Sequence, residues 1–328
     1  MMLQKTLSAA APSAPTARPR PSMLSEWRQY VVYAGFVIIF LAFSIALHDR
    51  GFLEPNNLLN IARQTAVIAI MAMAMTFVLS AGEIDLSIGA IAGLTSVTTG
   101  LALANYGLVA GIVGGLATGL VVGAVNGALT AWLGIPSFLV TLGMMGIARC
   151  VGMWVSGTSP VPVVDEMFNF AFGSGNLGPI PVLVFWVVAI AGLAQTALRS
   201  MPFGRKVLAT GGGETAARFS GVKTRMVKFQ VLVLSGVAAA IAGMLYAGRL
   251  HSGRFQLGEG DELSVIAAVV LGGTSLFGGA GTVIGSIVGA LLIGVINNGL
   301  ILLGLDYSQQ LIARGLLIIL AVALGRGR

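Results

Sequence analysis

The chain has 328 residues, of which 56% are hydrophobic and only 9% are charged. Soluble domains carry about 25% charged residues, so the composition excludes an ordinary soluble protein and predicts an integral membrane protein. The formal net charge of +7 does not indicate nucleic-acid binding, because the basic residues gather in loops and tails without a basic face interleaved with aromatic side chains. Cys150 is the only cysteine, which excludes an intrachain disulfide and a cysteine-based metal site.

The first residues are rich in Ala, Pro and Ser and lack a signal-peptide pattern, because no small-residue cleavage site follows a short apolar core. We interpret residues 1–28 as a disordered cytoplasmic tail. The remainder, residues 29–328, is expected to form a single transmembrane domain.

The apolar segments of the chain repeatedly match the length of about 20 residues that a helix needs to cross the hydrocarbon core. The expected fold class is an all-α integral membrane protein with about ten transmembrane helices. The run 263–276 is short for a full crossing, so it is expected to be a half-helix or a short tilted span. The expected spans are approximately 30–48, 58–80, 86–105, 108–129, 137–156, 181–198, 229–248, 263–276, 283–303 and 309–324.

Residues 199–228 form the only long polar segment between hydrophobic blocks, with seven Lys and Arg residues against one acid, Glu214. Basic loops resist translocation and stay in the cytoplasm. An even number of spans brings both termini to the same side as this loop. The polar stretch 249–262, with three acids, is expected to form an external loop. The sequence therefore predicts a multi-pass protein with both termini in the cytoplasm.

The stretch AGEIDLSIG, residues 81–89, places Glu83 and Asp85 between two apolar spans. Acids at membrane depth are costly and therefore suggest a function. They are also consistent with a simple turn, in which Asp85 or Ser87 caps the next helix. Both interpretations can hold, because a break in a helix makes polar backbone available to line a pathway.

Glycine recurs every fourth residue from Gly111 to Gly127, which predicts a ridge of small residues for close helix packing. The motif GAVNGAL at 123–129 is echoed by GVINNGL at 294–300, so Asn126 corresponds to Asn297. The two motifs lie on the fourth and ninth expected spans, an offset of five, so they would cross the membrane in opposite directions. This predicts an inverted internal repeat with a translocation path near its interface, although two short matches between glycine-rich segments also arise by chance.

Several motifs together resemble a known family. They are AGEIDLSIGA, PSFLVTLGMMGIARC, GGGETAARFSGVKTRMVK, and AAVVLGGTSLFGGAGTVIG followed by INNGLILLGLDYSQQ. In this order and spacing they resemble the permease subunits of bacterial ATP-binding-cassette importers for ribose, xylose and related monosaccharides. The resemblance extends from about residue 30 to the C-terminus.

The resemblance implies a transmembrane permease subunit in the bacterial inner membrane, without an enzymatic activity or a cofactor of its own. The implied partners are a cytoplasmic ATP-binding subunit, a periplasmic sugar-binding protein, and a second permease copy in a homodimer or heterodimer. The loop around GGGETAARFSG would dock into the ATPase, with the alternative being a solvated loop that only orients the chain. Its expected coupling residues are Gly212, Gly213, Glu214, Ala216, Ala217, Arg218 and Gly221.

This chain departs from the usual pattern of that family at a few positions. Gly213 stands where Asn is common, and Glu83 stands where Gly is common, before Ile-Asp-Leu-Ser. The second change adds a charge next to Asp85 and bears on substrate range more than on fold.

Neutral hydrogen-bonding side chains in the spans suit a hydroxyl-rich substrate that passes without tight binding. Each of them is equally consistent with a hydrogen bond between helices. The expected pathway residues are Asp85, Ser87, Asn126, Thr141, Asn297 and Asn298.

Two other function classes are open. A secondary transporter or channel would use Glu83 and Asp85 as an ion site, but few other ionisable groups lie at membrane depth to supply a proton relay. An intramembrane enzyme would need a metal cluster or a nucleophile with a base. The two histidines, His48 and His251, lie in different loops, and no HExxH, GxSxG or Walker A motif is present.

Overall fold

The computed structural model describes residues 23–306, 308–313 and 315–316. Residues 1–22 of the expected tail lie outside this part, and residues 23–28 belong to the first helix. Most of the expected tenth span, 309–324, also lies outside the described residues.

The described residues fold mainly into helices. The helices of the first half are α1 (Met23–Ala46), α2 (Pro55–Ser80), α3 (Ile88–Tyr106), α4 (Leu108–Ala131) and α5 (Ser137–Val155), with the short 3-10 helix η1 (His48–Arg50) after α1. The later helices are α6 (Glu166–Asn169), the π-helix η2 (Phe170–Ser174), α7 (Val182–Arg199), α8 (Pro202–Gly212), α9 (Glu214–Phe219), α10 (Thr224–Leu250), α11 (Asp261–Leu271) and α12 (Val283–Leu302). Two small antiparallel sheets pair β1 (Val161–Pro162) with β4 (Ser252–Gly253) and β2 (Asn176–Leu177) with β3 (Ile180–Pro181).

Among the described residues, seven helices are long and apolar enough to cross a membrane: α2, α3, α4, α5, α7, α10 and α12. This confirms the expected all-α membrane fold. Of the other three expected spans, the first corresponds to α1, whose part from Val32 to Ala46 is a shorter apolar helix, and the eighth to α11. With 11 residues, α11 is the half-helix that the short run 263–276 allowed.

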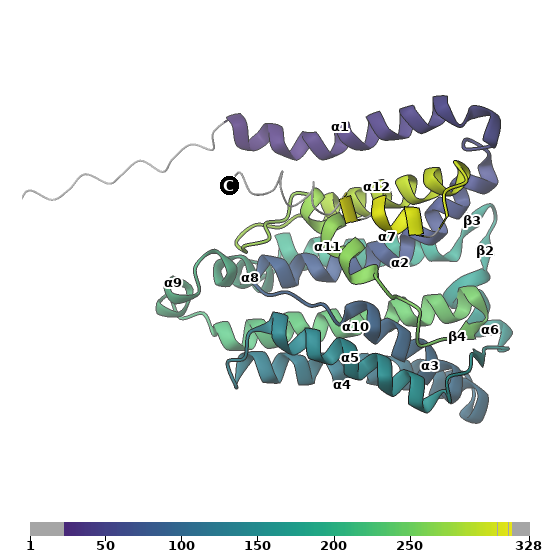
Figure 1. The fold of residues 1–328 in the computed structure, drawn as a ribbon. Coiled ribbons are helices and arrows are strands. Elements are labelled where there is room, and N and C mark those ends of the chain that lie inside the picture. Colours follow the sequence, from purple (N-terminus) through teal and green to yellow (C-terminus); the bar gives the residue numbers. More distant parts are fainter. Residues whose placement is uncertain (1–22, 307, 314, 317–328) are drawn as a thin grey trace, which may run out of the picture.

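The long helices lie roughly side by side, with α8 and α9 at one end of the molecule and α6, β2 and β4 at the other (Figure 1). Helices α2 and α10 pack against each other at the centre; α2 also contacts α7, α11 and α12, whereas α10 contacts α3 and α4. Helices α4, α5 and α7 instead expose many large apolar side chains, as a surface facing lipid requires.

The glycine ridge of α4 is confirmed as a packing surface. The five glycines at every fourth position from Gly111 to Gly127 are all buried. A Cβ atom added at Gly119 would overlap the carbonyl oxygen of Gly236 in α10, and one at Gly123 would lie 2.8 Å from the carbonyl oxygen of Leu232. Small residues therefore let the backbones of α4 and α10 touch, which is how helices pack closely in lipid.

Two segments interrupt the helices within the bundle. The first, residues 81–87, joins α2 to α3, and the second, residues 251–260, joins α10 to α11. A Cβ at Gly93 of α3 would lie 2.6 Å from the carbonyl oxygens of Phe255 and Leu257, so the second segment lies directly against α3. The expectation of an external loop over 249–262 is therefore wrong: Arg249 belongs to α10, Asp261 begins α11, and the residues between them fold back along α3. Gly89 and Gly93 of α3 make this close contact possible, because they have no side chain in the way. The sequence alone does not indicate which segment packs against them.

Substituting Gly119 by Ala tests the backbone contact between α4 and α10. The added methyl group meets a backbone atom, which cannot rotate away, so we expect a loss of about 1–3 kcal/mol of stability. Thermal unfolding of the detergent-solubilised protein measures it. Gly146→Ala in α5 is the matched control, since no atom lies within 4 Å of its Cβ position and the change should be neutral or stabilising. Equal melting temperatures for the two variants would contradict the packing described here.

Candidate functional site

The basic segment 199–228 folds into helices, and its last residues belong to α10. Helix α9 is short, with Glu214 in its first turn and Arg218 in its last, the arrangement that the helix dipole favours. Gly221 follows with a φ of +84°, a left-handed conformation that suits glycine. Ala217 is buried, whereas the Phe219 side chain is 85% exposed. The expected short helix with a glycine stop is therefore present, and it holds a large apolar side chain in solvent.

Helix α8 fixes this pair of helices to the bundle. A Cβ at Gly211 would overlap the carbonyl oxygen of Ser80, the last residue of α2. Gly278 and Gly279, in the loop before α12, contact Gly211 and Gly212 from another side. Gly212, a predicted coupling residue, thus lies where three segments meet at backbone distance.

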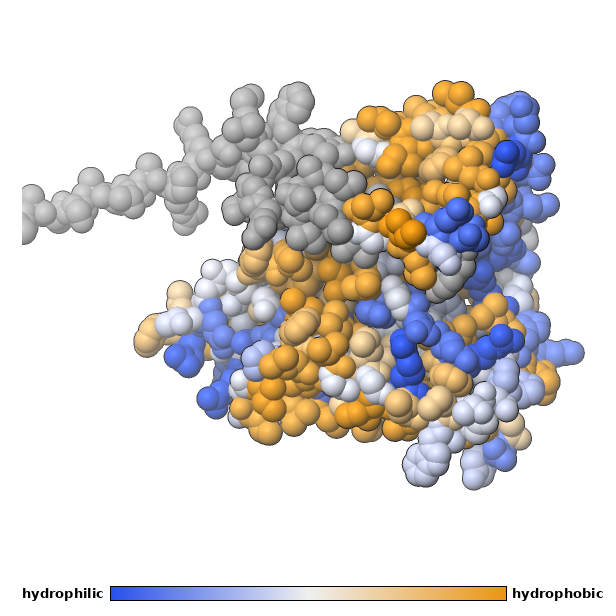
Figure 2. Space-filling view, viewed as in Figure 1, coloured by the Kyte–Doolittle hydropathy of each residue, from blue (hydrophilic) through white to orange (hydrophobic). Residues whose placement is uncertain are grey.

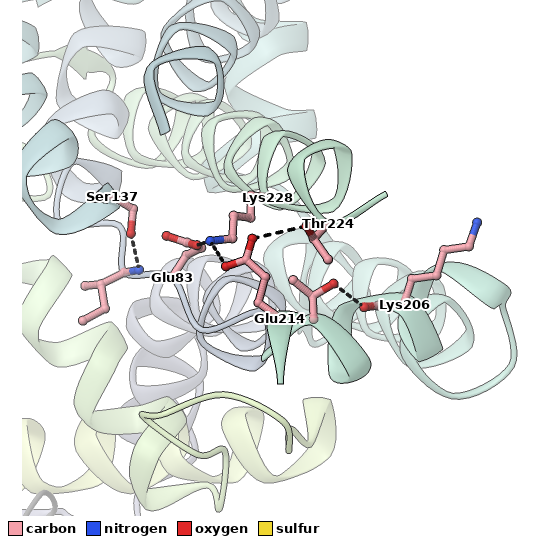
Figure 3. A network of polar contacts seen from close by, with 8 residues as sticks. Glu83, Ser137, Lys206, Glu214, Thr224 and Lys228 are labelled. Carbon is pink, nitrogen blue, oxygen red and sulfur yellow. Dashed lines mark hydrogen bonds and ion pairs between the residues drawn. The ribbon is translucent and has the colours of Figure 1, made fainter. Parts of the chain in front are cut away.

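An ion-pair network joins α9 to the first helix interruption (Figure 3). Lys228 Nζ lies 2.9 Å from Glu83 Oε1 and 2.8 Å from Glu214 Oε2. Thr224 donates a hydrogen bond of 3.2 Å to Glu214 Oε1. The hydrogen bond from Lys228 is the main cause that lowers the pKa of Glu214, so this carboxylate is ionised at neutral pH. One lysine at the start of α10 therefore bridges the helix at the end of the molecule and the segment that carries Asp85.

Sequence reasoning missed this network. The sequence places Lys228 only among the basic residues of segment 199–228, and Glu83 only as a second acid next to Asp85. The available signal is the presence of an acid at Glu83, between two spans, and of a lysine near the start of a later span. Nothing in the sequence alone indicates that Glu83 and Lys228 lie next to each other.

A double-mutant cycle with Glu83→Gln and Lys228→Met tests the ion pair. Glu83 is 8% exposed and Lys228 20% exposed, so the partly screened pair should couple the two changes by about 1–3 kcal/mol. Thermal unfolding of the four proteins gives the coupling. The same cycle on Arg149 and Glu259, a pair with 31% and 53% exposed side chains, should give less than about 1 kcal/mol. Equal coupling in both cycles would show that Lys228 has no special role.

Asp85 is the centre of a fully buried polar cluster. Its Oδ1 accepts hydrogen bonds from the Ser87 amide at 2.8 Å and the Ser87 hydroxyl at 2.6 Å. Its Oδ2 accepts one from Ser235 of α10 at 2.6 Å. Asn126 of α4 donates to the Ser87 hydroxyl at 2.9 Å. Asp85 therefore organises the turn into α3 and joins three helices. The N-cap position of α3 is Ser87, whose side chain makes no capping hydrogen bond.

The backbone of the same segment is bound by α5. Ser137 Oγ accepts a hydrogen bond of 3.0 Å from the Ile84 amide, and Thr141 Oγ1 accepts one of 3.0 Å from the Leu86 amide. The structure thus brings four of the six predicted pathway residues, Asp85, Ser87, Asn126 and Thr141, to one place. Each of them has a protein hydrogen-bond partner there.

The two remaining predicted pathway residues, Asn297 and Asn298 of α12, do not belong to the Asp85 cluster. Asn298 and Asn57 exchange two hydrogen bonds, of 2.8 and 3.0 Å, which join α12 to α2. This pair is an interhelical contact of the kind expected for asparagine in a span. Asn297, one position earlier, lines a separate pocket.

That pocket has a volume of about 180 Å³ and lies between α2, α10, α11 and α12. Apolar groups on α2 and α12 form part of its wall. Its polar lining is Gln64, Thr65, Tyr246, Arg249, Asp261, Ser264 and Asn297. Of these, only Asn297 was predicted, because Arg249 and Asp261 were assigned to an external loop. The missed signal is their helical spacing: Tyr246 with Arg249, and Asp261 with Ser264, are each three residues apart and share a face.

Hydrophilic side chains interrupt the apolar surface next to this region. In Figure 2 a blue patch lies within the orange surface, where Figure 1 has the segment before α11. Arg254, Gln256 and Glu259 of that segment are exposed. Arg149 of α5 pairs with Glu259 at 3.0 Å. Within the part of the chain that the structure describes, no group of three or more His, Cys, Asp or Glu residues is arranged to hold a metal ion.

Apolar membrane-length helices, interrupted twice inside the bundle and enclosing a polar pocket, define a multi-pass membrane protein of the transport class. A sequence model of the family described as "Branched-chain amino acid transport system / permease component" matches residues 57–322, and the chain belongs to this family.

Curated relatives are similar over most of their length. The chain is 40% identical over 291 residues to the ribose import permease protein RbsC of Bacillus subtilis (strain 168), covering 88% of this chain and 90% of the relative. It is 36% identical over 303 residues to the D-allose transport system permease protein AlsC of Escherichia coli (strain K12), covering 92% of each. It is 35% identical over 301 residues to the L-arabinose transport system permease protein AraH of the same strain, covering 92% and 91%.

Membership of this family defines the class of transporter to which the chain belongs. The chain is a permease component of the ATP-binding-cassette type, which is not itself an enzyme, because ATP hydrolysis lies in a separate subunit. The family implies an ATP-binding subunit and a substrate-binding protein as partners in general.

Proposed function

We propose that this protein is the permease subunit of an ATP-driven importer for a monosaccharide of the ribose or xylose type. The observation that carries the proposal is helix α9, which projects from one end of the bundle and is tied through Lys228 to the helix interruption at Glu83. The relatives named for ribose, D-allose and L-arabinose support a monosaccharide as the substrate class.

Helix α9 acts as the coupling helix that docks into the ATP-binding subunit. Its exposed Phe219 supplies an apolar anchor, and Arg218 supplies a charge for acids on the partner. Glu214 begins the helix, and Gly221 follows its end in a left-handed conformation. Ala216 and Ala217 give the helix small side chains, which allow close contact with a partner. Gly212 and Gly213 form the joint with α8, which transmits movement to the ends of α2 and of the loop before α12.

Phe219→Asp tests this docking. Removing an interface anchor typically costs more than about 2 kcal/mol, so co-purification of the ATP-binding subunit should fall at least about tenfold. Tyr106→Asp is the matched control, because Tyr106 is 81% exposed at the end of α3, away from α9. Retained docking by Phe219→Asp, or uptake that persists without any ATP-binding subunit, would overturn the proposal.

The proposed position of α9 also gives the orientation of the chain in the membrane. With α9 in the cytoplasm, the basic segment obeys the positive-inside rule, and both termini lie on the cytoplasmic face of the bacterial inner membrane after about ten crossings. The inverted repeat would relate α2, α3 and α4 to α10, α11 and α12. In support, α2 packs against α11 and α12 as α10 packs against α3 and α4. Each unit also has an acid-Leu-Ser motif where its helix interruption meets the next helix, Asp85-Leu86-Ser87 before α3 and Glu262-Leu263-Ser264 at the start of α11.

The exposed polar segment at 254–260 supports a water-filled path shared with a second permease copy. Irregular backbone is tolerated at membrane depth only where protein buries it or water reaches it. This segment lies against Gly89 and Gly93, in the first half of α3, and yet carries exposed Arg254, Gln256 and Glu259. A second copy facing this surface would keep lipid away from it.

Cysteine labelling tests the path. In a Cys150→Ser background, Gln256→Cys should react with a membrane-impermeant thiol reagent roughly tenfold faster than Val188→Cys, because thiolates form in water and not in lipid. Val188, 65% exposed on the apolar face of α7, is the lipid-facing control. A Gln256→Cys protein as unreactive as the control would rule out a water-filled path here.

The alternative, a secondary transporter or channel with Glu83 and Asp85 as its ion site, is less well supported. Glu83 is paired with Lys228, and both Asp85 oxygens accept hydrogen bonds from serines. Uptake into vesicles that is driven by a pH or sodium gradient alone would favour it.

A further inference from the structure

The pocket between α2, α10, α11 and α12 contains a buried hydroxyl group without a partner. Thr65 is 3% exposed, and its Oγ1 makes no hydrogen bond to any described residue. It lines the pocket, where Gly294 of α12 faces it without a side chain. Most buried hydroxyl groups are hydrogen-bonded, and an unpartnered one in the wall of a pocket is open to a ligand or a water in that pocket.

The lining of the pocket suits a neutral molecule with many hydroxyl groups. A hydroxyl both donates and accepts hydrogen bonds, so it needs both kinds of partner. Arg249 offers donors and Gln64 offers both kinds of partner, while the Asp261 carboxylate, which accepts a hydrogen bond from Tyr246 through Oδ2, has more than one acceptor position. One cationic and one anionic side chain balance each other, which favours a solute without net charge. The volume of about 180 Å³ fits a small solute, because pockets for drug-sized ligands reach about 300–1,000 Å³.

The position of the pocket connects it to the exposed polar segment. Asp261 is the first residue of α11 and directly follows segment 254–260. The pocket also lies at the boundary between α2 and the group α10–α12, the two units of the repeat considered above. Substrate sites of membrane transporters commonly lie at such a boundary, where helices are discontinuous.

We propose that this pocket is a binding site for the hydroxyl groups of a monosaccharide on its way through the permease, with Thr65 as one of its ligands. The inference rests on the proposed function for the identity of the substrate. It assigns specific substrate contacts to Gln64, Thr65, Arg249 and Asp261, which belong to α2, α10 and α11 and not to the buried Asp85 cluster.

Protection from labelling tests binding directly. The probe is Thr65→Cys in a Cys150→Ser background, in the complex with its ATP-binding subunit and without ATP, labelled by a small thiol reagent. D-ribose, D-allose and L-arabinose at millimolar concentration are compared with L-leucine, since a carboxylate and an ammonium group could also pair with Arg249 and Asp261. Slower labelling with at least one sugar, but not with leucine, is expected. Protection by leucine alone would make this an amino-acid site, and protection by none of the four would remove it as a binding site; either result overturns the proposal.

Transport provides the second readout. Loss of one neutral hydrogen bond corresponds to about a three- to tenfold effect, so Thr65→Val should lower the rate of sugar uptake into proteoliposomes by that factor at unchanged ATPase activity. Thr99→Val is the matched control, because Thr99 also buries an unpartnered hydroxyl, but next to Gly115 and outside the pocket. Equal effects of the two variants would overturn the proposal.

The two readouts separate the inference from the function on which it rests. If the wild-type complex imports sugar under ATP while Thr65→Cys is never protected, the pocket fails and the importer stands. If a sugar protects Thr65→Cys but ATP drives no uptake, the binding site stands and the importer fails.

Discussion

Peptide groups that leave a helix inside a bilayer must find hydrogen-bond partners within the protein, and this constraint organises the described structure. The first interruption meets it through Ser137 and Thr141 of α5, which accept hydrogen bonds from its amides. The second meets it through Ser96 of α3, whose hydroxyl bonds both the amide and the carbonyl of Arg254 at 3.0 Å. Glycines admit both segments at backbone distance. The small residues are therefore what makes two broken helices compatible with a membrane bundle.

The buried polar groups are of two kinds: those with a hydrogen-bond partner in the protein and those without one. Asp85 and Ser87 have short hydrogen bonds to their neighbours, which makes them part of the scaffold that holds the interruption. Thr65 has no such partner and lines a pocket. Buried groups of the first kind stabilise one conformation, whereas a group of the second kind is available to a solute. A missing partner together with a place in the pocket wall makes Thr65 a candidate substrate contact, whereas Thr99, whose hydroxyl is also unpartnered, lies outside the pocket.

The proposed coupling also depends on the first interruption. Lys228 contacts Glu214 on α9 and Glu83 on the segment that leads to Asp85. Glu83 is buried, so its charge is held by Lys228 in surroundings where water screens the attraction only weakly. A displacement of α9 by the ATP-binding subunit would therefore reach the scaffold around α3, α4 and α5 through one side chain.

The sequence by itself determined the class of protein, the limits of most spans, the small-residue ridge of α4 and the short helix at Glu214. These follow from local rules: span length, glycine spacing and the preference of acids and glycine for helix ends. Only the tertiary structure decided that segment 251–260 folds back against α3, that Lys228 meets Glu83, and that residues from four helices enclose one pocket. Such contacts join positions far apart in the chain, and they depend on backbone approach and helix rotation, which residue types and spacing do not encode.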